Sequence, residues 1–294
     1  MLRKFYFAGA GFLVLSLVLF SCTKSNAESK KMESHKEELI SENSLQKEDT
    51  DFYKIDLVLS KMSERFCEEV KIPDEKKYEF LADLSVMMEE QENIKNQYKS
   101  DDLPLLFLID KTHSISSEYE PKELVHLENN EFYKVNKNSL SLRPEASDAL
   151  LKMAKAASLD GINLTISSTY RSYEYQKNLF AYWVKVDGLE EAERESARPG
   201  TSQHQLGIAM DFAPVDDAFA QTESGKWVYQ NAAKFGWSLS FPKNYEDITG
   251  YRWESWHFRY IGEFTCEFQK KWFLDVQQYM IEFLDEWNKT EISS

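Results

Sequence analysis

The stretch "SQHQLGIAMDF", residues 202–212, holds one of the five histidines in this chain of 294 residues. Alternate residues of a strand point to the same face, so Asp211 shares a face with the small residues Gly207 and Ala209, while larger apolar residues face a core. His204 lies seven residues before Asp211, and this odd offset requires a turn or bulge near Gly207. On this stretch alone, the two polar side chains fit either a metal site or an ordinary pair at the surface.

A second stretch, "RWESWHFRY" at residues 252–260, places Glu254 three residues before His257 among aromatic residues. A catalytic zinc takes three His, Asp or Glu ligands and keeps one position open. It also needs a nearby carboxylate that is not a ligand. The residues that fill the three ligand positions are His204, Asp211 and His257. Glu254 fits the second role if it lies in a loop before the strand; alternatively it is a fourth ligand and the site is structural.

A third stretch, "TYRSYEYQ" at residues 169–176, contains Arg171 at the expected end of a strand and Gln176 about one helical turn later. Arginine can hold a carboxylate with two parallel hydrogen bonds or stabilise an oxyanion. The commoner role of a single arginine is a surface salt bridge, which these residues alone leave open.

Together the three stretches resemble the zinc D-alanyl-D-alanine carboxypeptidases of the VanY type and the related L,D-carboxypeptidases, which act on peptidoglycan stem peptides. The family pattern S-x-H-x-x-G-x-A-x-D is met in full by Ser202, His204, Gly207, Ala209 and Asp211. The later pattern E-x-x-H is met by Glu254 and His257. The resemblance covers residues 103–262.

The resemblance implies a role for each of these residues. The implied zinc ligands are His204, Asp211 and His257, and the implied general base is Glu254. The residues implied to orient the substrate or its oxyanion are Arg171, Gln176 and Ser202. Arg171 is also implied to be a catalytic residue.

The expected activity is removal of a terminal D-alanine from stem peptides, by D,D- or L,D-carboxypeptidase action with a Zn²⁺ cofactor. Two alternatives stay open at this stage. One is a non-catalytic surface lipoprotein that keeps a peptidase fold and binds wall or host components. The other is a zinc endopeptidase that cuts within the stem peptide.

The pattern of elements favours an α+β fold, with a small antiparallel sheet flanked by helices. Apolar residues at helical spacing predict a helical hairpin over residues 51–100, before a catalytic domain at 103–262. Within that domain a helix is expected at 144–159, with proline in its first turn and Gly161 after its end. One amphipathic helix is expected within residues 263–294.

The first residues predict export. Residues 1–21 combine a basic start with an apolar run, as in a signal peptide. The run ends in "LFSC", which resembles a lipoprotein processing site and would make Cys22 the lipidated N-terminus. Cleavage after Ala27 and an uncleaved anchor are the alternatives. Residues 22–50 are too polar to form a core and are expected to be a disordered tether.

The net charge of −15 argues against nucleic acid and against electrostatic docking on anionic lipid. Membrane attachment would therefore depend on the lipid anchor, which places the protein in the cell envelope, on the periplasmic or cell-surface side. The partners expected are peptidoglycan peptides, and the protein is expected to be a monomer. Cys67 and Cys266 could form a disulfide or remain two buried thiols.

Overall fold

The computed structural model describes residues 50–100 and 102–291. The predicted signal peptide, the lipidation site Cys22 and nearly all of the tether lie outside the described residues. The chain divides into two units, Met1–Lys54 and Ile55–Ser294, and the second holds every element considered below. Within the described residues, none of the helices combines the length and apolar character needed to cross a membrane.

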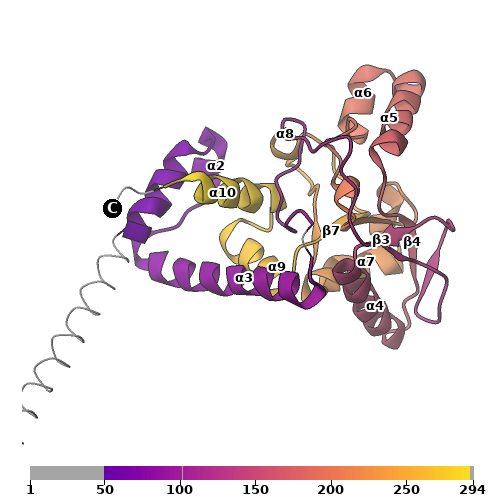
Figure 1. Cartoon of the computed structure of the whole chain (residues 1–294), viewed down its shortest axis with the longest axis horizontal. Helices are drawn as coiled ribbons and strands as arrows, with labels where there is room; N and C mark the ends of the chain where they lie inside the picture. Colours follow the sequence, from indigo (N-terminus) through magenta and orange to yellow (C-terminus); the bar gives the residue numbers. More distant parts are fainter. Residues whose placement is uncertain (1–49, 101, 292–294) are drawn as a thin grey trace, which may run out of the picture. The chain divides into compact units, whose positions relative to one another are not determined.

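A five-stranded sheet forms the centre of the second unit (Figure 1). Its strands, in spatial order, are β2 (Tyr133–Val135), β4 (Leu164–Ser168), β5 (Ala209–Phe212), β7 (His257–Tyr260) and β6 (Trp237–Leu239). The α+β prediction is confirmed. All neighbouring pairs are antiparallel except β2 and β4, which run parallel. The sheet is therefore antiparallel as expected except at this one pair, where the chain crosses from β2 to β4 through a helix.

That helix, α4 (Pro144–Leu159), occupies the predicted residues and has proline in its first turn. Gly161 follows it with a φ of +75°, a conformation that favours glycine. The other helices of this part are α5 (Tyr173–Asp187), α6 (Leu189–Glu195) and α7 (Glu223–Asn231). A short two-stranded sheet pairs β1 (Val125–His126) with β3 (Ser141–Leu142).

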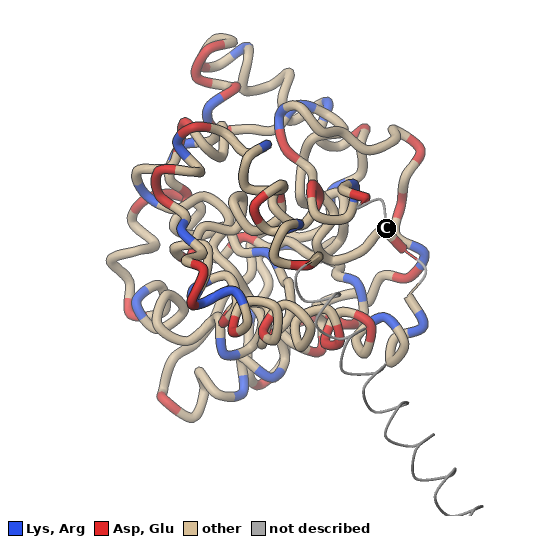
Figure 2. The backbone as a smooth tube through the Cα atoms, turned by 90° about the vertical axis from the view of Figure 1, so that its left-hand side faces the viewer, with Lys and Arg blue, Asp and Glu red and all other residues tan. Residues whose placement is uncertain are grey.

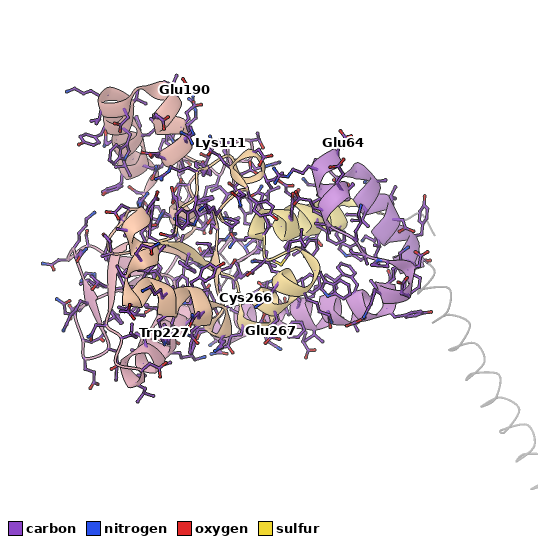
Figure 3. The ribbon with its side chains drawn as sticks, turned by 180° about the vertical axis from the view of Figure 1, so that it is seen from behind. Glu64, Lys111, Glu190, Trp227, Cys266 and Glu267 are labelled. Carbon is purple, nitrogen blue, oxygen red and sulfur yellow. The ribbon has the colours of Figure 1, made fainter. Side chains whose placement is uncertain are left out.

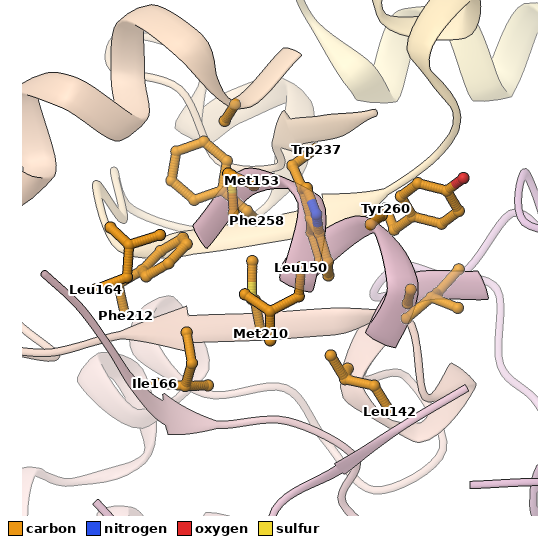
Figure 4. Packing of buried hydrophobic residues seen from close by; sticks show 14 of the residues in the cluster. Leu142, Leu150, Met153, Leu164, Ile166, Met210, Phe212, Trp237, Phe258 and Tyr260 are labelled. Carbon is orange, nitrogen blue, oxygen red and sulfur yellow. The ribbon is translucent and has the colours of Figure 1, made fainter. Parts of the chain in front are cut away.

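The apolar face of β5 lies in the core beneath the sheet (Figure 4). Met210 and Phe212 have no exposed surface, and the ring of Phe212 meets that of Phe258 on β7 edge to face, with centroids 5.6 Å apart. The α4 residues Leu150 and Met153 belong to the same cluster. We call this cluster the sheet core. The alternation seen in the sequence therefore turns Asp211 to the opposite face of the strand.

A second cluster, which we call the helical core, is built from helices at the two ends of the described chain. They are α2 (Glu64–Glu69), α3 (Lys77–Tyr98), α9 (Glu263–Trp272) and α10 (Gln277–Lys289). Its centre is aromatic: Phe80 of α3 contacts the rings of Phe268, Trp272 and Phe283 at centroid distances of 5.3–5.5 Å.

Two helical predictions need correction here. The single helix expected within residues 263–294 is divided into α9 and α10, because Leu274 and Asp275 adopt φ values of 57° and 62°. The Asp275 carboxylate accepts a hydrogen bond from the Gln269 side chain at 3.0 Å, which closes the end of α9 without a glycine or proline to mark it. The first half of the predicted hairpin is also interrupted. The Ser63 side chain accepts a hydrogen bond from the backbone N–H of Phe66 and so caps the start of a separate helix, α2.

Cys67 and Cys266 are separate free thiols. Cys67 donates to the carbonyl of Leu59, and Cys266 is buried in α9. Figure 2 shows acidic and basic residues interspersed along the described backbone.

Candidate metal centre

The bend required by the odd offset between His204 and Asp211 is present. His204 lies on a single turn of 3-10 helix, η2 (Gln203–Leu206), and Ser202 caps this turn by accepting from the His204 backbone N–H at 3.3 Å. Gly207 ends the turn with a φ of +73°, and a Cβ there would lie 3.0 Å from the Pro121 side chain. The turn brings His204 Nε2 to 3.3 Å from Asp211 Oδ2.

His257 reaches the same point through strand register. Asp211 on β5 is directly opposite His257 on β7, and His257 Nδ1 lies 3.0 Å from Asp211 Oδ1. One ligand atom from each of His204, Asp211 and His257 lies within 4.8 Å of the other two, and all three residues are buried. The structure therefore brings together the three residues expected to hold zinc, and we call His204, Asp211 and His257 the metal group.

In each imidazole, the nitrogen that points away from the metal group makes a hydrogen bond, and this bond orients the other nitrogen toward the metal group. His204 Nδ1 lies 2.7 Å from the carbonyl oxygen of Thr169, so Nδ1 carries the proton and Nε2 keeps its lone pair. His257 Nε2 lies 3.1 Å from Gln203 Oε1, so Nδ1 keeps its lone pair there. Such outer partners orient histidine ligands in metal sites. Two imidazole nitrogens and a carboxylate, converging in this way, fit Zn²⁺.

The electrostatics of this group favour a cation. Burial and, second, the positive charge of Arg171 together lower the pKa of His204 to about 4, although Asp211 acts to raise it, so this imidazole is neutral at pH 7. Burial acts to raise the pKa of Asp211, but His204 and Arg171 outweigh it and hold that pKa well below its ordinary value. The group thus presents one negative charge and two lone pairs in a buried place.

Glu254 lies in the loop before β7, where the spacing of three residues predicted it. It is 8% exposed, and its Oε2 is 3.8 Å from His257 Nδ1. Burial, followed by the nearby charge of Asp211, raises the pKa of Glu254 well above its ordinary value. A carboxylate beside the metal group with a raised pKa has the properties of a general base.

Arg171 contacts the metal group directly. Its Nη2 donates to Asp211 Oδ2 at 2.6 Å and its Nε donates to Ser168 Oγ at 2.9 Å. Gln176, expected to bind substrate, lies fully buried behind Arg171, where its Oε1 accepts from Arg171 Nη1 at 3.4 Å. Its amide nitrogen is held by the carbonyl of Ala197 at 2.8 Å. The geometry thus places Gln176 as a support for Arg171.

Three residues that the sequence analysis did not single out complete the support of His257. Gln203 Oε1, which accepts from His257, also accepts from Ser240 Oγ at 2.7 Å. Gln203 Nε2 donates to Gln277 Oε1 at 3.3 Å. Gln203 adjoins a motif histidine and could have been suspected, but Gln277 belongs to α10, and no local pattern connects it to the site.

A cavity of about 550 Å³ opens over the metal group. Its wall includes the metal group together with Arg171, Ser202 and Glu254. It continues along α5, where Tyr175, Leu179 and Trp183 line it. The cavity therefore offers access to the metal group and room for a substrate much longer than one amino acid.

Comparison with known proteins places this arrangement in a family. Residues 139–263 match the family model of VanY, D-alanyl-D-alanine carboxypeptidase. The putative carboxypeptidase YodJ of Bacillus subtilis (strain 168) is 37% identical over 181 residues, which are 60% of this chain and 66% of YodJ. The chain belongs to the VanY family. The matched residues contain the whole metal group, Arg171 and Glu254, but leave out α3 and α10.

The solved structure of a second relative agrees with the assignment to the VanY family. The LdcB LD-carboxypeptidase is 36% identical, covers 62% of this chain and 86% of its own, and superposes with a TM-score of 0.54. A VanY D,D-pentapeptidase from a VanB-type resistance cassette, in complex with Zn(II), is 28% identical over 60% of this chain and 98% of its own, with a TM-score of 0.48. The resemblance seen in the three sequence stretches is confirmed. Peptidoglycan lies in the cell envelope, which agrees with the envelope location expected.

Proposed function

We propose that this VanY-family protein is a zinc-dependent carboxypeptidase that removes a terminal D-alanine from peptidoglycan stem peptides. The observation that carries the proposal is the buried group of His204, Asp211 and His257 with Glu254 beside it in an open cavity. The activities named for its relatives, LD-carboxypeptidase for LdcB and D,D-pentapeptidase for VanY, support the same reaction class.

His204, Asp211 and His257 would hold the zinc ion, through Nε2, a carboxylate oxygen and Nδ1 respectively. Bound zinc supplies Lewis acidity, which acidifies water and polarises a carbonyl. Glu254 takes the proton from the attacking water and returns it to the leaving amine of D-alanine. The low dielectric around Glu254 strengthens these interactions.

Arg171 orients the substrate. Its ion pair with Asp211 and its bond to Ser168 fix the guanidinium at the cavity wall, with a side chain 17% exposed. From there it holds the terminal carboxylate or stabilises the oxyanion. Gln176 keeps Arg171 in place, and Ser202 holds the η2 turn that carries His204.

The direct test is Glu254→Gln in purified, zinc-loaded protein. D-alanine release from wall peptides should fall by about 10²–10⁴-fold, the usual contribution of a general base, while zinc content stays at the wild-type level. Loss of zinc together with activity would instead make Glu254 a ligand, the alternative that the spacing left open. Unchanged D-alanine release would contradict the proposal.

Mass analysis of digested wall fragments separates the proposed reaction from its alternatives. Release of one D-alanine indicates a carboxypeptidase, and its yield from tetrapeptides against pentapeptides distinguishes L,D from D,D action. Internal cleavage would indicate an endopeptidase. An unchanged digest would indicate a non-catalytic binding lipoprotein.

For the location, we propose export and lipidation at Cys22, with the mature protein acting as a monomer beside the wall. Lipoprotein maturation supplies more than one acyl chain, as stable anchoring requires. Cys22→Ala should move the protein from the membrane fraction to the soluble fraction. Membrane retention of that variant, or a dimer mass in solution, would contradict this part.

A further inference from the structure

Helix α5 lines the active-site cavity with an apolar face. Tyr175, Leu179 and Trp183 follow one another at intervals of four residues, the spacing that puts side chains on one face of a helix. Trp183 also meets Tyr182 edge to face, with ring centroids 5.2 Å apart. We call Tyr175, Leu179 and Trp183 the α5 ledge.

Helices α5 and α6, which we call the α5–α6 hairpin, carry several exposed apolar side chains. Tyr175, Tyr182, Val186 and Leu189 are between 50% and 56% exposed. Figure 3 shows the hairpin, marked by Glu190, standing out from the other elements of this unit. Of these four residues, Tyr175 also lines the cavity, and exposed apolar surface at a cavity wall is typical of a binding site.

The length of the ledge can be compared with the substrate. An α-helix rises 1.5 Å per residue, so Trp183 lies about 12 Å along the helix from Tyr175, on the side away from Arg171. A stem tetrapeptide or pentapeptide cut before its last residue leaves three or four residues, which span about 10–13 Å when extended. The trimmed stem peptide is therefore about as long as the ledge, and the cavity that contains the metal group continues along this ledge.

The chemistry of the ledge suits a sugar. A pyranose has apolar C–H faces and a polar rim, and aromatic side chains such as Tyr and Trp combine an apolar ring with a hydrogen-bonding tip. The three ledge residues carry no charge, whereas Ser167 and Asp216 on the same cavity wall can bond hydroxyl groups. A charged peptide residue would gain little from this face.

We propose that the α5 ledge binds a sugar ring of the glycan that carries the stem peptide, so that the enzyme prefers glycan-linked peptides over free peptides. This inference rests on the proposed carboxypeptidase function. It adds a binding site some distance from the reacting bond. It also gives the α5–α6 hairpin a role in discriminating between substrates.

The test compares kcat/KM for a disaccharide-linked stem peptide and for the free peptide of the same sequence. Wild type should prefer the linked substrate by about tenfold, an effect of the size expected for one well-packed aromatic contact. Trp183→Ala should remove this preference through KM while the free peptide is cleaved within about twofold of wild type, and Trp183→Phe should restore most of it. Tyr229→Ala, at a position 76% exposed on α7, is the matched control and should leave both values unchanged.

The outcomes are separable. If wild type cleaves both substrates equally, or if Trp183→Ala lowers kcat/KM for both by the same factor, the ledge is not a sugar site. If wild type cleaves neither substrate, the proposed function fails and this inference fails with it.

Discussion

The sheet core and the helical core both consist of buried apolar residues, but only the sheet core lies against the buried polar group expected to hold a metal. Strands β5 and β7 turn one face to the sheet core and the other to a buried group of His204, Asp211 and His257. The helical core is centred on packed aromatic rings around Phe80. The residues expected to carry out the chemistry therefore lie beside the sheet core, whereas the helical core contributes mainly packing.

The two cores meet through a few specific hydrogen bonds. Gln277 of α10 bonds Gln203, which holds His257, and Gln278 donates to Asp110 on the cavity wall at 2.9 Å. Within the helical core, Glu90 of α3 accepts from the backbone amides of Phe264 and Thr265 in the first turn of α9 at 2.8 Å. The helical core therefore influences the site through α10, which positions Gln203 and Asp110. We expect variants in the two cores to have different consequences.

The largest effect should come from the metal group itself. His257→Ala removes one of three ligands, so zinc should be lost and D-alanine release should fall by at least about 10⁴-fold. Zinc content by plasma mass spectrometry and D-alanine release measure the two effects. His126→Ala, at a position 49% exposed outside the site, should retain zinc and activity. Retained zinc in the His257 variant would contradict the ligand assignment.

Phe80→Ala should destabilise without changing the chemistry. Removing this fully buried ring should lower the free energy of unfolding by about 3–5 kcal/mol. The folded protein should keep its zinc and a kcat within about twofold of wild type. Denaturant unfolding of the zinc-loaded protein measures the free energy of unfolding, and Val86→Ala, on the exposed side of α3, is the control. A large fall in kcat at full folding would show that the two cores are not separable.

Acid should weaken the metal-free protein through His204. Its pKa falls from 6.5 in the unfolded chain to about 4 when folded, so between these values the unfolded chain binds more protons and folding is progressively disfavoured. The loss from this residue should approach about 3 kcal/mol at pH 4. His204→Asn should flatten the dependence of unfolding free energy on pH between 6.5 and 4, whereas Phe80→Ala should lower the curve evenly. Parallel curves for wild type and His204→Asn would contradict this.

The smallest effect should come from the contact between the cores. Gln277→Leu removes the bond to Gln203 and should weaken zinc binding by about 10-fold, at the low end of the range for outer partners of metal ligands. Competition with a chromogenic chelator measures it, and Gln277→Glu, which keeps an acceptor oxygen, should recover most of the affinity. Zinc affinity equal to wild type in Gln277→Leu would remove α10 from the site.

Much of the site could be predicted because its residues lie in short, patterned stretches. The alternation of residues 208–212 predicted which face Asp211 takes, and the odd offset of His204 predicted the turn that η2 supplies. The interval from Glu254 to His257 predicted a loop before β7. Each of these depends on backbone geometry over a few residues, which local sequence specifies.

The helical end could be predicted only in part. Apolar spacing indicated helices, but nothing local showed that α9 ends before Leu274, because Asp275 holds that break through a side-chain bond. The parallel pairing of β2 with β4 likewise depends on where α4 packs. Gln176 was predicted on the correct helix, yet only packing shows that it supports Arg171 from behind.

The sequence by itself determined the donor set, the neighbouring carboxylate, the family and the α+β class, because these depend on residue type and spacing. Tertiary structure decided which imidazole nitrogens face the metal group, the contact of Gln277 with Gln203, and the extension of the cavity along α5. These features join segments far apart in the chain, and packing of the two cores brings them within hydrogen-bond distance.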